Sequence, residues 1–152
     1  MLEAWRMVKQ KYAATAFSGE GAARNGGRWN SRGVPAVYAS STKSLAALES
    51  LVHLNPHILF TYVFISLKFD DALLEIIQPQ TLPSNWRAEP PPSATQQIGD
   101  AWVRDARSAV LALPSVLIEG ELNYLLNPAH QNFRKIAIGK PEKFTFDPRL
   151  LV

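Results

Sequence analysis

The sequence predicts a compact α+β fold whose sheet is mostly antiparallel and which carries only a few helices. Short segments rich in β-branched and aromatic residues outnumber the helical segments. The helical segments do not alternate with the strands, so a parallel α/β sheet is disfavoured. The chain has 152 residues, of which 47% are hydrophobic and 19% are charged. This size and composition are typical of one globular domain with its own core, so we expect a single domain over residues 1–152.

Strand patterns recur along the whole chain. They lie at residues 2–8, 36–40, 59–69, 73–77, 109–113, 116–119, 135–139 and 143–146. The longest of them, 59–69, alternates so that Val63, Ile65 and Leu67 share one apolar face. That face is expected to cover the core.

The clearest helix is expected over residues 42–54. Ser41 or Thr42 is available as its N-cap, and Pro56 lies just beyond its end. Its apolar stripe is expected to consist of Leu45, Leu48 and Val52.

A second helix is expected from helical spacing later in the chain, although Gly99 weakens it. The spacing is carried by Ile98, Ala101, Trp102 and Ala106. Asn127-Pro128 resembles an N-cap followed by a proline at the first helical position, so a short helical turn is expected there.

Two segments are expected to be irregular. Residues 18–33 contain five glycines, which favour turns. Residues 89–97, EPPPSATQQ, form a proline-rich stretch that we interpret as a surface loop, because strand and helix patterns continue beyond it.

Composition disfavours several classes of function. The absence of cysteine excludes a thiol nucleophile, a Cys-ligated zinc site and a disulfide framework. No apolar run has the length of a membrane span and the N-terminus lacks a signal-peptide layout, so we expect a cytoplasmic protein without membrane contact. The net charge of +3 is small and its basic residues are dispersed, so direct nucleic-acid binding is disfavoured.

Local motifs disfavour two common kinds of active site. His53 and His57 have i, i+4 spacing, but Pro56 lies between them and no third ligand is apparent, so no metal site is expected. Ser115 follows Pro114 at the end of an apolar strand without the Gly-x-Ser-x-Gly turn of a serine hydrolase. A hydrogen-bonding role at the strand end remains open to Ser115.

Arg28, Tyr38 and Glu49 stand close together in a combination that a core does not require. Arg28 follows two glycines, and its planar fork of donors suits either phosphate oxygens or a nearby carboxylate. Tyr38 is either an ordinary half-buried strand aromatic or a ring that stacks on a flat heterocycle while its hydroxyl stays in water. Glu49 projects at the edge of the helical stripe, either as a surface residue over the rim of the core or as a carboxylate held at a cleft wall. Its position alone slightly favours the surface role.

Three blocks of sequence occur in an order typical of one known family. They are SGEGAARNGGRWNSRGVPAVYASSTKSLAALESLVHL, IGDAWVRDARSAVLALPSVLIEGELNYLLNPAHQNF and FTFDPRL. On these blocks the chain resembles the RES-domain family, the toxin components of type II toxin–antitoxin modules that are paired with Xre-like antitoxins. The resemblance extends from about Trp5 to Leu150. Gln131 departs from the proline that members often have there, outside the proposed site.

The resemblance implies particular site residues. The Arg, Glu and Ser that name the family fall on Arg28, Glu49 and Ser115, and its site Tyr falls on Tyr38. The Asn of its Asn-Pro-x-His segment falls on Asn127. The implied catalytic residues are Glu49, Arg28, Tyr38 and Ser115, and the implied contacts to NAD+ come from Arg28, Tyr38, Ser115 and Asn127.

The resemblance also implies a fold similar to the ADP-ribosyltransferase core, in which NAD+ binds in a cleft between antiparallel sheets. The implied activity is cleavage of NAD+ at the nicotinamide–ribose bond, as a glycohydrolase or phosphorylase, which depletes cellular NAD+. NAD+ is the substrate, and no cofactor or metal is expected. Glycosyl cleavage develops positive charge on the ribose, which a fixed carboxylate at Glu49 would stabilise.

The expected partner is a cognate Xre-like antitoxin protein in a higher-order toxin–antitoxin complex. Two alternatives stay open. One is an ADP-ribosyltransferase that modifies a specific protein, because the sequence does not decide whether water, phosphate or a protein side chain accepts the ADP-ribosyl group. The other is a non-enzymatic interaction or nucleic-acid-binding module.

Overall fold

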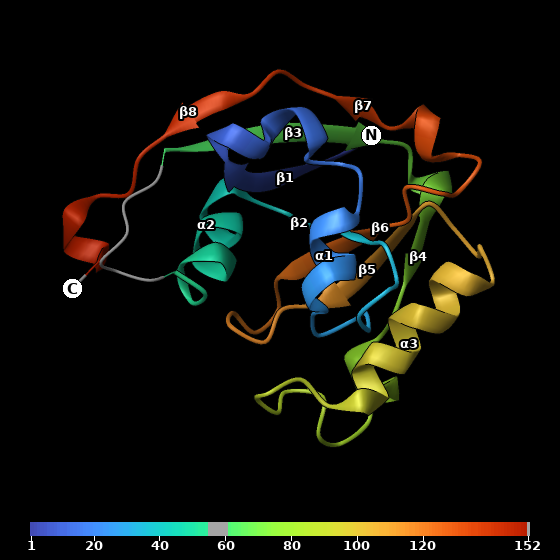
Figure 1. Cartoon of the computed structure of the whole chain (residues 1–152). Helices are drawn as coiled ribbons and strands as arrows, with labels where there is room; N and C mark the ends of the chain where they lie inside the picture. The colour runs from blue at the N-terminus through green and yellow to red at the C-terminus, as the bar shows by residue number, and fades with distance from the viewer. Residues whose placement is uncertain (55–60, 152) are drawn as a thin grey trace.

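The computed structural model describes residues 1–54 and 61–151, which form one curled sheet with three α-helices (Figure 1). The strands are β1 (Leu2–Lys9), β2 (Val37–Ser40), β3 (Tyr62–Phe69), β4 (Leu74–Ile76), β5 (Val110–Pro114), β6 (Leu122–Leu126), β7 (Ala137–Ile138) and β8 (Glu142–Phe144). The helices are α1 (Glu20–Asn25), α2 (Lys43–Leu51) and α3 (Ser93–Arg104), and short 3-10 turns connect several elements. None of the helices in the described part of the chain is long and apolar enough to cross a membrane.

The sheet confirms the predicted fold class. Its order is β4-β5-β6-β2-β1-β3-β7, and β8 pairs with β3. β4 and β5 are parallel, whereas every other pair of neighbouring strands is antiparallel. The resemblance implied separate sheets around a cleft, but these strands belong to one sheet. β1 and β3 cross the upper part of the view, and β4, β5 and β6 lie below them (Figure 1).

The two faces of the sheet have different coverings. One face carries alternate residues such as Ala4, Val37 and Leu126, which pack in the largest apolar cluster. On the other face, α3 places Trp102 against Leu111 and Leu125 of β5 and β6. The same face is covered at β1 and β3 by α2, in a second cluster of Met7, Ala46, Tyr62, Phe64 and Phe146. The helices α2 and α3 therefore cover separate parts of one face and leave β2 and the start of β6 between them.

Most predicted strands are confirmed within a residue or two at their ends. The strands expected at 2–8, 36–40, 73–77 and 109–113 are β1, β2, β4 and β5. The expected strand 59–69 is β3, although residues 59 and 60 lie outside the described part of the chain, as do Asn55, Pro56 and His57. The segment 135–139 contains β7, and the segment 143–146 overlaps β8, which begins one residue earlier and ends two residues earlier.

The predicted N-cap of α2 is confirmed, but the predicted apolar stripe is correct only at Leu45 and wrong at Leu48 and Val52. The side chain of Thr42 accepts a hydrogen bond from the backbone N–H of Leu45 at 3.1 Å. Leu48 is 38% exposed and Val52 is 57% exposed, whereas Leu45 and Ala46 are buried. At 100° per residue, Glu49 lies between Leu45 and Ala46 on the helix surface. Glu49 is therefore at the middle of the face that meets the sheet, where the small Ala46 permits close packing.

The expectation of irregular backbone over residues 18–33 is partly wrong, because α1 lies inside this segment. Gly19 precedes the helix with φ 80°, and Gly26 follows it with φ 72°. These glycines bound the helix, and Ala22, Ala23 and Arg24 within it are good helix formers. The high glycine content favoured a prediction of turns, although a short helix lies between Gly19 and Gly26.

The strand expected at 116–119 is also wrong. Residues 116–119 form a turn, and the strand in this region is β6, which the sequence interpretation did not predict. Ser115 Oγ accepts hydrogen bonds from the backbone N–H groups of Leu117 and Ile118, so the chain turns immediately after β5. It reverses at Gly120, with φ 87°, and returns as β6.

Asn127 caps a turn rather than a helix. Its side-chain Oδ1 accepts a hydrogen bond from the backbone N–H of Ala129 at 3.0 Å, but residues 128–132 form turns. The expected cap is present, and the helical turn expected after it is wrong.

The helix α3 begins earlier than expected, inside the segment 89–97 that we interpreted as a loop. Pro92 precedes its first turn, and Ala106 lies beyond its end with φ 48°. Gly99 is buried within it, and a side chain there would overlap the backbone carbonyl of Trp29. The helix keeps this glycine because the backbone of the 27–31 segment packs directly on it.

This close contact predicts that Gly99→Ala strongly destabilises the protein. The added methyl must displace a backbone rather than a flexible side chain, so we expect a loss of about 1–3 kcal/mol or more in unfolding free energy. Gly21→Ala is the matched control, because nothing lies within 4 Å of a Cβ added there in α1. The control should be neutral or stabilising by up to about 1 kcal/mol. Denaturant unfolding of both variants measures the difference, and equal stabilities would contradict the contact.

Candidate functional site

The pairing of β2 with β6 places two polar residues opposite each other on the face between α2 and α3. Ser40 pairs with Asn123, and Tyr38, two residues along β2, pairs with Leu125. Side chains two residues apart on a strand share a face and lie roughly 7 Å apart along it. Ser40, Asn123 and Tyr38 therefore lie on one side of the sheet.

Glu49 reaches this face from α2 and is held by two donors. Its Oε1 accepts hydrogen bonds from Ser115 Oγ at 2.8 Å and from Asn123 Nδ2 at 2.7 Å. Among the described residues, no hydrogen bond or ion pair reaches Oε2. The side chain is half-buried. The two donors orient the carboxylate through Oε1 and leave Oε2 available. This geometry contradicts a purely solvated surface role.

Ser115 has a complete set of hydrogen-bond partners. Its buried hydroxyl donates to Glu49, and it accepts the backbone N–H groups of Leu117 and Ile118, both at 3.1 Å. A hydroxyl has one proton and two lone pairs, so these three contacts use all of them. Ser115 therefore holds Glu49 in this structure, and direct contact with a ligand would require one of its partners to leave.

Tyr38 is bonded through its hydroxyl inside the protein. The hydroxyl donates to Asn30 Oδ1 at 2.6 Å and accepts the backbone N–H of Trp29 at 3.1 Å. Burial raises the pKa of Tyr38 well above its ordinary value, although the hydrogen bond from Trp29 lowers the pKa in part. The expectation of a hydroxyl in water is therefore wrong. Gly27 is required beside it, because a Cβ at that position would lie 2.6 Å from the hydroxyl.

Arg28 is tied to a neighbouring loop. Its Nη1 donates to the carbonyls of Trp86 at 3.0 Å and Ala88 at 2.7 Å. Its Nη2 pairs with the carboxylate of Glu89 at 2.8 Å. The side chain of Arg28 is 15% exposed and that of Glu89 is 70% exposed, so the ion pair lies at the protein surface. The structure thus shows the carboxylate pairing that was one of the two alternatives for Arg28.

Asn127 is not part of this group. Asn123 and Asn127 lie at opposite ends of β6, roughly 13 Å apart at the usual rise of a strand. Asn127 is buried, and its side chain caps the turn at Ala129 and makes a long contact of 3.4 Å with the carbonyl of Val103. The structure therefore brings Glu49, Ser115 and Tyr38 onto one face, places Arg28 next to Trp29 beside Tyr38, and gives Asn127 a different location.

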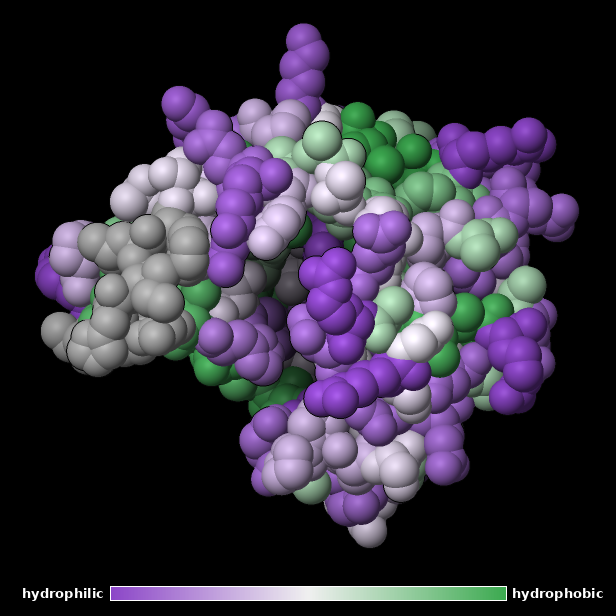
Figure 2. Space-filling model, viewed as in Figure 1, coloured by the Kyte–Doolittle hydropathy of each residue, from purple (hydrophilic) through white to green (hydrophobic). Residues whose placement is uncertain are grey.

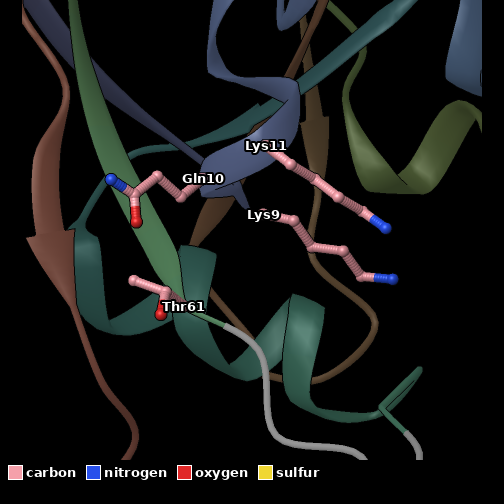
Figure 3. Close-up of a pocket in the computed structure, with 4 residues that line it drawn as sticks. All are labelled: Lys9, Gln10, Lys11 and Thr61. Carbon is pink, nitrogen blue, oxygen red and sulfur yellow. The ribbon is translucent and has the colours of Figure 1, made fainter.

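The surface is hollowed in more than one place. Figure 2 shows a recess between the positions of α2 and α1. Another hollow, of about 320 Å³, is lined by Lys9, Gln10, Lys11 and Thr61 (Figure 3). That second hollow contains neither a carboxylate nor an aromatic ring, so we place the candidate site at the recess that α2 borders.

The site contains one residue that the sequence interpretation missed. Asn123 was not singled out, although it is a polar residue between Leu122 and Tyr124 in what proves to be a strand. Recognition of that strand would have indicated Asn123 as a polar side chain on an otherwise apolar face. Among residues 1–54 and 61–151, no group of three or more His, Cys, Asp or Glu side chains is arranged to hold a metal ion.

The chain thus combines a curled, mostly antiparallel sheet with a carboxylate on α2 that two donors from the sheet side hold in place. The profile of the family described as RES domain matches residues 3–147, and the chain belongs to this family. As the resemblance implied, it is a RES-domain toxin.

Similar proteins cover nearly the whole chain. A protein named Toxin Res from Yersinia enterocolitica is 40% identical over 96% of this chain and 97% of its own length. A protein named Prs ADP-ribosylating toxin from a Sphingobium species is 39% identical over 97% of this chain and 95% of its own length. A chain of the crystal structure of the M. tuberculosis MbcT–MbcA toxin–antitoxin complex matches with a TM-score of 0.74. That match has 18% identity, over 99% of this chain and 86% of the other, so it supports the fold.

The buried hydroxyl of Tyr38 predicts a change in stability at alkaline pH. Because the pKa of Tyr38 is raised in the folded state, the unfolded chain releases this proton first, and stability should fall as pH rises from about 10 toward the folded pKa. Tyr38→Phe removes this contribution and also leaves Trp29 N–H without its acceptor, at a cost of about 1–3 kcal/mol below pH 9. The difference in unfolding free energy between wild type and variant should therefore shrink above pH 10. Tyr12→Phe, at a half-exposed position, is the matched control for the loss of one tyrosine hydroxyl.

Proposed function

We propose that this toxin consumes NAD+ by cleaving the bond between nicotinamide and ribose. The observation that carries the proposal is the carboxylate of Glu49, which two donors fix through Oε1 while Oε2 has no partner among the described residues. Such a group can stabilise positive charge without reorganising during the reaction. Support for an NAD+-using enzyme also comes from the name of the Sphingobium relative, an ADP-ribosylating toxin.

The proposed reaction needs no redox partner. The bond from the ribose C1 carbon to the nicotinamide nitrogen breaks, and its electron pair leaves with nicotinamide, which becomes neutral. The ribose then carries oxocarbenium-like positive charge, which Glu49 stabilises. Water or phosphate forms the new bond to C1, and attack by water releases one proton to solvent. The ring nitrogen is already cationic in NAD+, so the leaving group requires no metal ion for activation.

The other residues of the candidate site suit the rest of the substrate. In this proposal the ring of Tyr38 contacts a flat part of NAD+, because its hydroxyl is occupied by Trp29 and Asn30. Arg28 binds the pyrophosphate through its guanidinium, which is the side chain best suited to bidentate phosphate contacts. Because Arg28 now pairs with Glu89, the substrate must replace or share that partner. Ser115 and Asn127 were assigned to NAD+ by the resemblance, and we now assign Ser115 to holding Glu49.

A second candidate is ADP-ribosylation of a protein. It differs only in the nucleophile, which would be a side chain of the target instead of water or phosphate. The observation that favours it is the name of the Sphingobium relative, which shares 39% of its residues over nearly the whole length of both chains. Degradation of NAD+ remains our first choice, because the proposed reaction is complete with water or phosphate as the acceptor.

The proposed partner is an antitoxin protein of the Xre-like type. The structural relative belongs to a toxin–antitoxin complex, which supports a partner of this general kind. The small, dispersed positive charge gives the chain no concentrated nucleic-acid surface, so we assign any DNA contact to the partner. We propose that the toxin acts in the cytoplasm, where its substrate is available.

The proposal predicts release of nicotinamide from NAD+ by the purified, antitoxin-free protein, with or without a metal chelator. The mass of the second product separates ADP-ribose from its phosphate ester, and labelled NAD+ with cell lysate reveals transfer to protein. Glu49→Gln keeps the shape of the side chain but removes its charge, so turnover should fall by roughly 100-fold or more. Glu3→Gln makes the same change at an exposed position of β1 and should retain full activity.

Intact NAD+ under all of these conditions, with folded wild-type protein, would overturn the enzymatic proposal. Normal turnover by a folded Glu49→Gln variant would overturn the role of Glu49.

The position of Arg28 predicts opposite effects of two substitutions on the KM for NAD+. Arg28→Lys loses the bidentate fork and should raise KM by roughly tenfold, because a point charge suits a pyrophosphate less well. Glu89→Gln removes the competing carboxylate and should lower KM. Arg107→Lys is the control, because Arg107 makes a bidentate pair with Glu75 elsewhere on the surface. If Arg28→Lys leaves KM unchanged, Arg28 only fastens the 86–89 loop.

A further inference from the structure

Asn123 is joined to Glu49 on one side and to Ser40 on the other. Its Nδ2 donates to Glu49 Oε1 at 2.7 Å, and its Oδ1 accepts the hydroxyl of Ser40 at 2.7 Å. A carboxylate can only accept, so the amide must present its nitrogen to Glu49. The hydroxyl of Ser40 then completes the oxygen side of the amide and fixes its orientation. Ser40 is buried and comes from β2, whereas Asn123 comes from β6.

The hydrogen bonds from Ser40 to Asn123 and from Asn123 to Glu49 attach the carboxylate to the sheet. Ser40 and Asn123 are cross-strand partners at the centre of the sheet, and both strands pair with a further strand on their other side. Ser115 approaches the same oxygen from the end of β5. Two donors on Oε1 restrict rotation of the carboxylate.

Other charged or titratable groups lie on the elements around Glu49. They are Lys43 on α2, Glu3, Arg6 and Lys9 on β1, Tyr38 on β2, and Glu119 and Glu121 between β5 and β6. Arg6 donates to the carbonyls of Ala16 and Tyr38, and Lys43 pairs with Glu142. The two hydrogen bonds that the described residues make to Glu49 come from neutral donors, Ser115 and Asn123.

We infer that Asn123 is a positioning residue that aims Glu49 at the reacting ribose. It acts through Oε1 and leaves Oε2 to face the sugar, with Ser40 fixing the orientation of the amide. The inference rests on the proposed function, because Glu49 is the group that it positions. Ser40 and Asn123 make no contact with the substrate in this assignment.

The decisive variant is Asn123→Asp, which keeps the shape of the side chain and replaces the donor by a carboxylate next to Glu49. Two carboxylates at this distance cannot both be ionised comfortably, so the pair should bind a proton at acidic pH. With that proton the new group donates to Glu49 as the amide did, and without it the two groups repel. We expect kcat to fall at least tenfold at pH 8 and to recover relative to wild type as pH is lowered to 5.5. Asn132→Asp adds the same charge beyond the other end of β6 and should leave the pH profile unchanged.

A double-mutant comparison separates positioning from general destabilisation. Asn123→Ala should lower kcat by at least tenfold with little change in KM, and it should have no further effect when Glu49 is already Gln. Ser40→Ala, which retains Asn123, should lower kcat by a smaller factor and keeps the test possible if Asn123 variants fold poorly.

The outcomes distinguish a failure of the proposed function from a failure of the role of Asn123. If wild-type protein releases no nicotinamide, the proposed function fails. If wild type is active while Asn123→Asp keeps its kcat and pH profile, or Asn123→Ala is equally harmful in the Glu49→Gln background, Asn123 does not position Glu49.

Discussion

The site depends on the placement of one carboxylate at the buried face of a helix. Glu49 lies between Leu45 and Ala46, so its charge would meet the sheet without compensation if no donors were present. Ser115 and Asn123 supply these donors from β5 and β6, and thereby connect α2 to the hairpin over sequence separations of 66 and 74 residues. Because both donors bind Oε1, the half-buried carboxylate has hydrogen-bond partners inside the fold and neither donor occupies Oε2. The hydrogen bonds that make the helix compatible with the sheet also aim the carboxylate.

A second polar centre organises the loop that carries Arg28. Asn30 is fully buried, and its amide donates to the carbonyls of Ala22 and Val34 while its Oδ1 accepts the hydroxyl of Tyr38. The adjoining segment is fastened to α3, where Asp100 accepts both the N–H and the hydroxyl of Ser31. The glycine-rich sequence is therefore ordered by its own Asn30 and by side chains from β2 and α3. Gly27 permits the closest of these approaches, against Tyr38.

The sequence could predict features that depend on local pattern, but not those that depend on register. Alternation was sufficient for most strands, and the spacing of polar residues was sufficient for the N-cap at Thr42. The stripe of α2 was ambiguous, because a period of 3.6 fits Leu48 and Val52 as well as Ala46 and Glu49, and only the sheet decides between them. Asn123 could not be recognised, since its role depends on pairing with Ser40 across 83 residues. Arg28, Tyr38, Glu49 and Ser115 were available as candidates, whereas their partners Trp86, Trp29 and Asn123 were not.

The two sides of the candidate site differ in how they are prepared for a ligand. Neutral donors hold Oε1 of Glu49, so a ligand at Oε2 displaces none of the residues that the structure describes, and the orientation of the carboxylate is maintained. Arg28 instead has protein partners on both terminal nitrogens, and the most exposed of them is the carboxylate of Glu89. An anion that approaches Arg28 can replace this carboxylate while the two backbone carbonyls remain bound, because the exposed pair is weak and screened by solvent. In the proposed function, binding and chemistry are thus separated. Selection of the anionic part of NAD+ is assigned to an exchangeable ion pair at the surface, and the carboxylate assigned to the reacting bond is fixed before the ligand arrives.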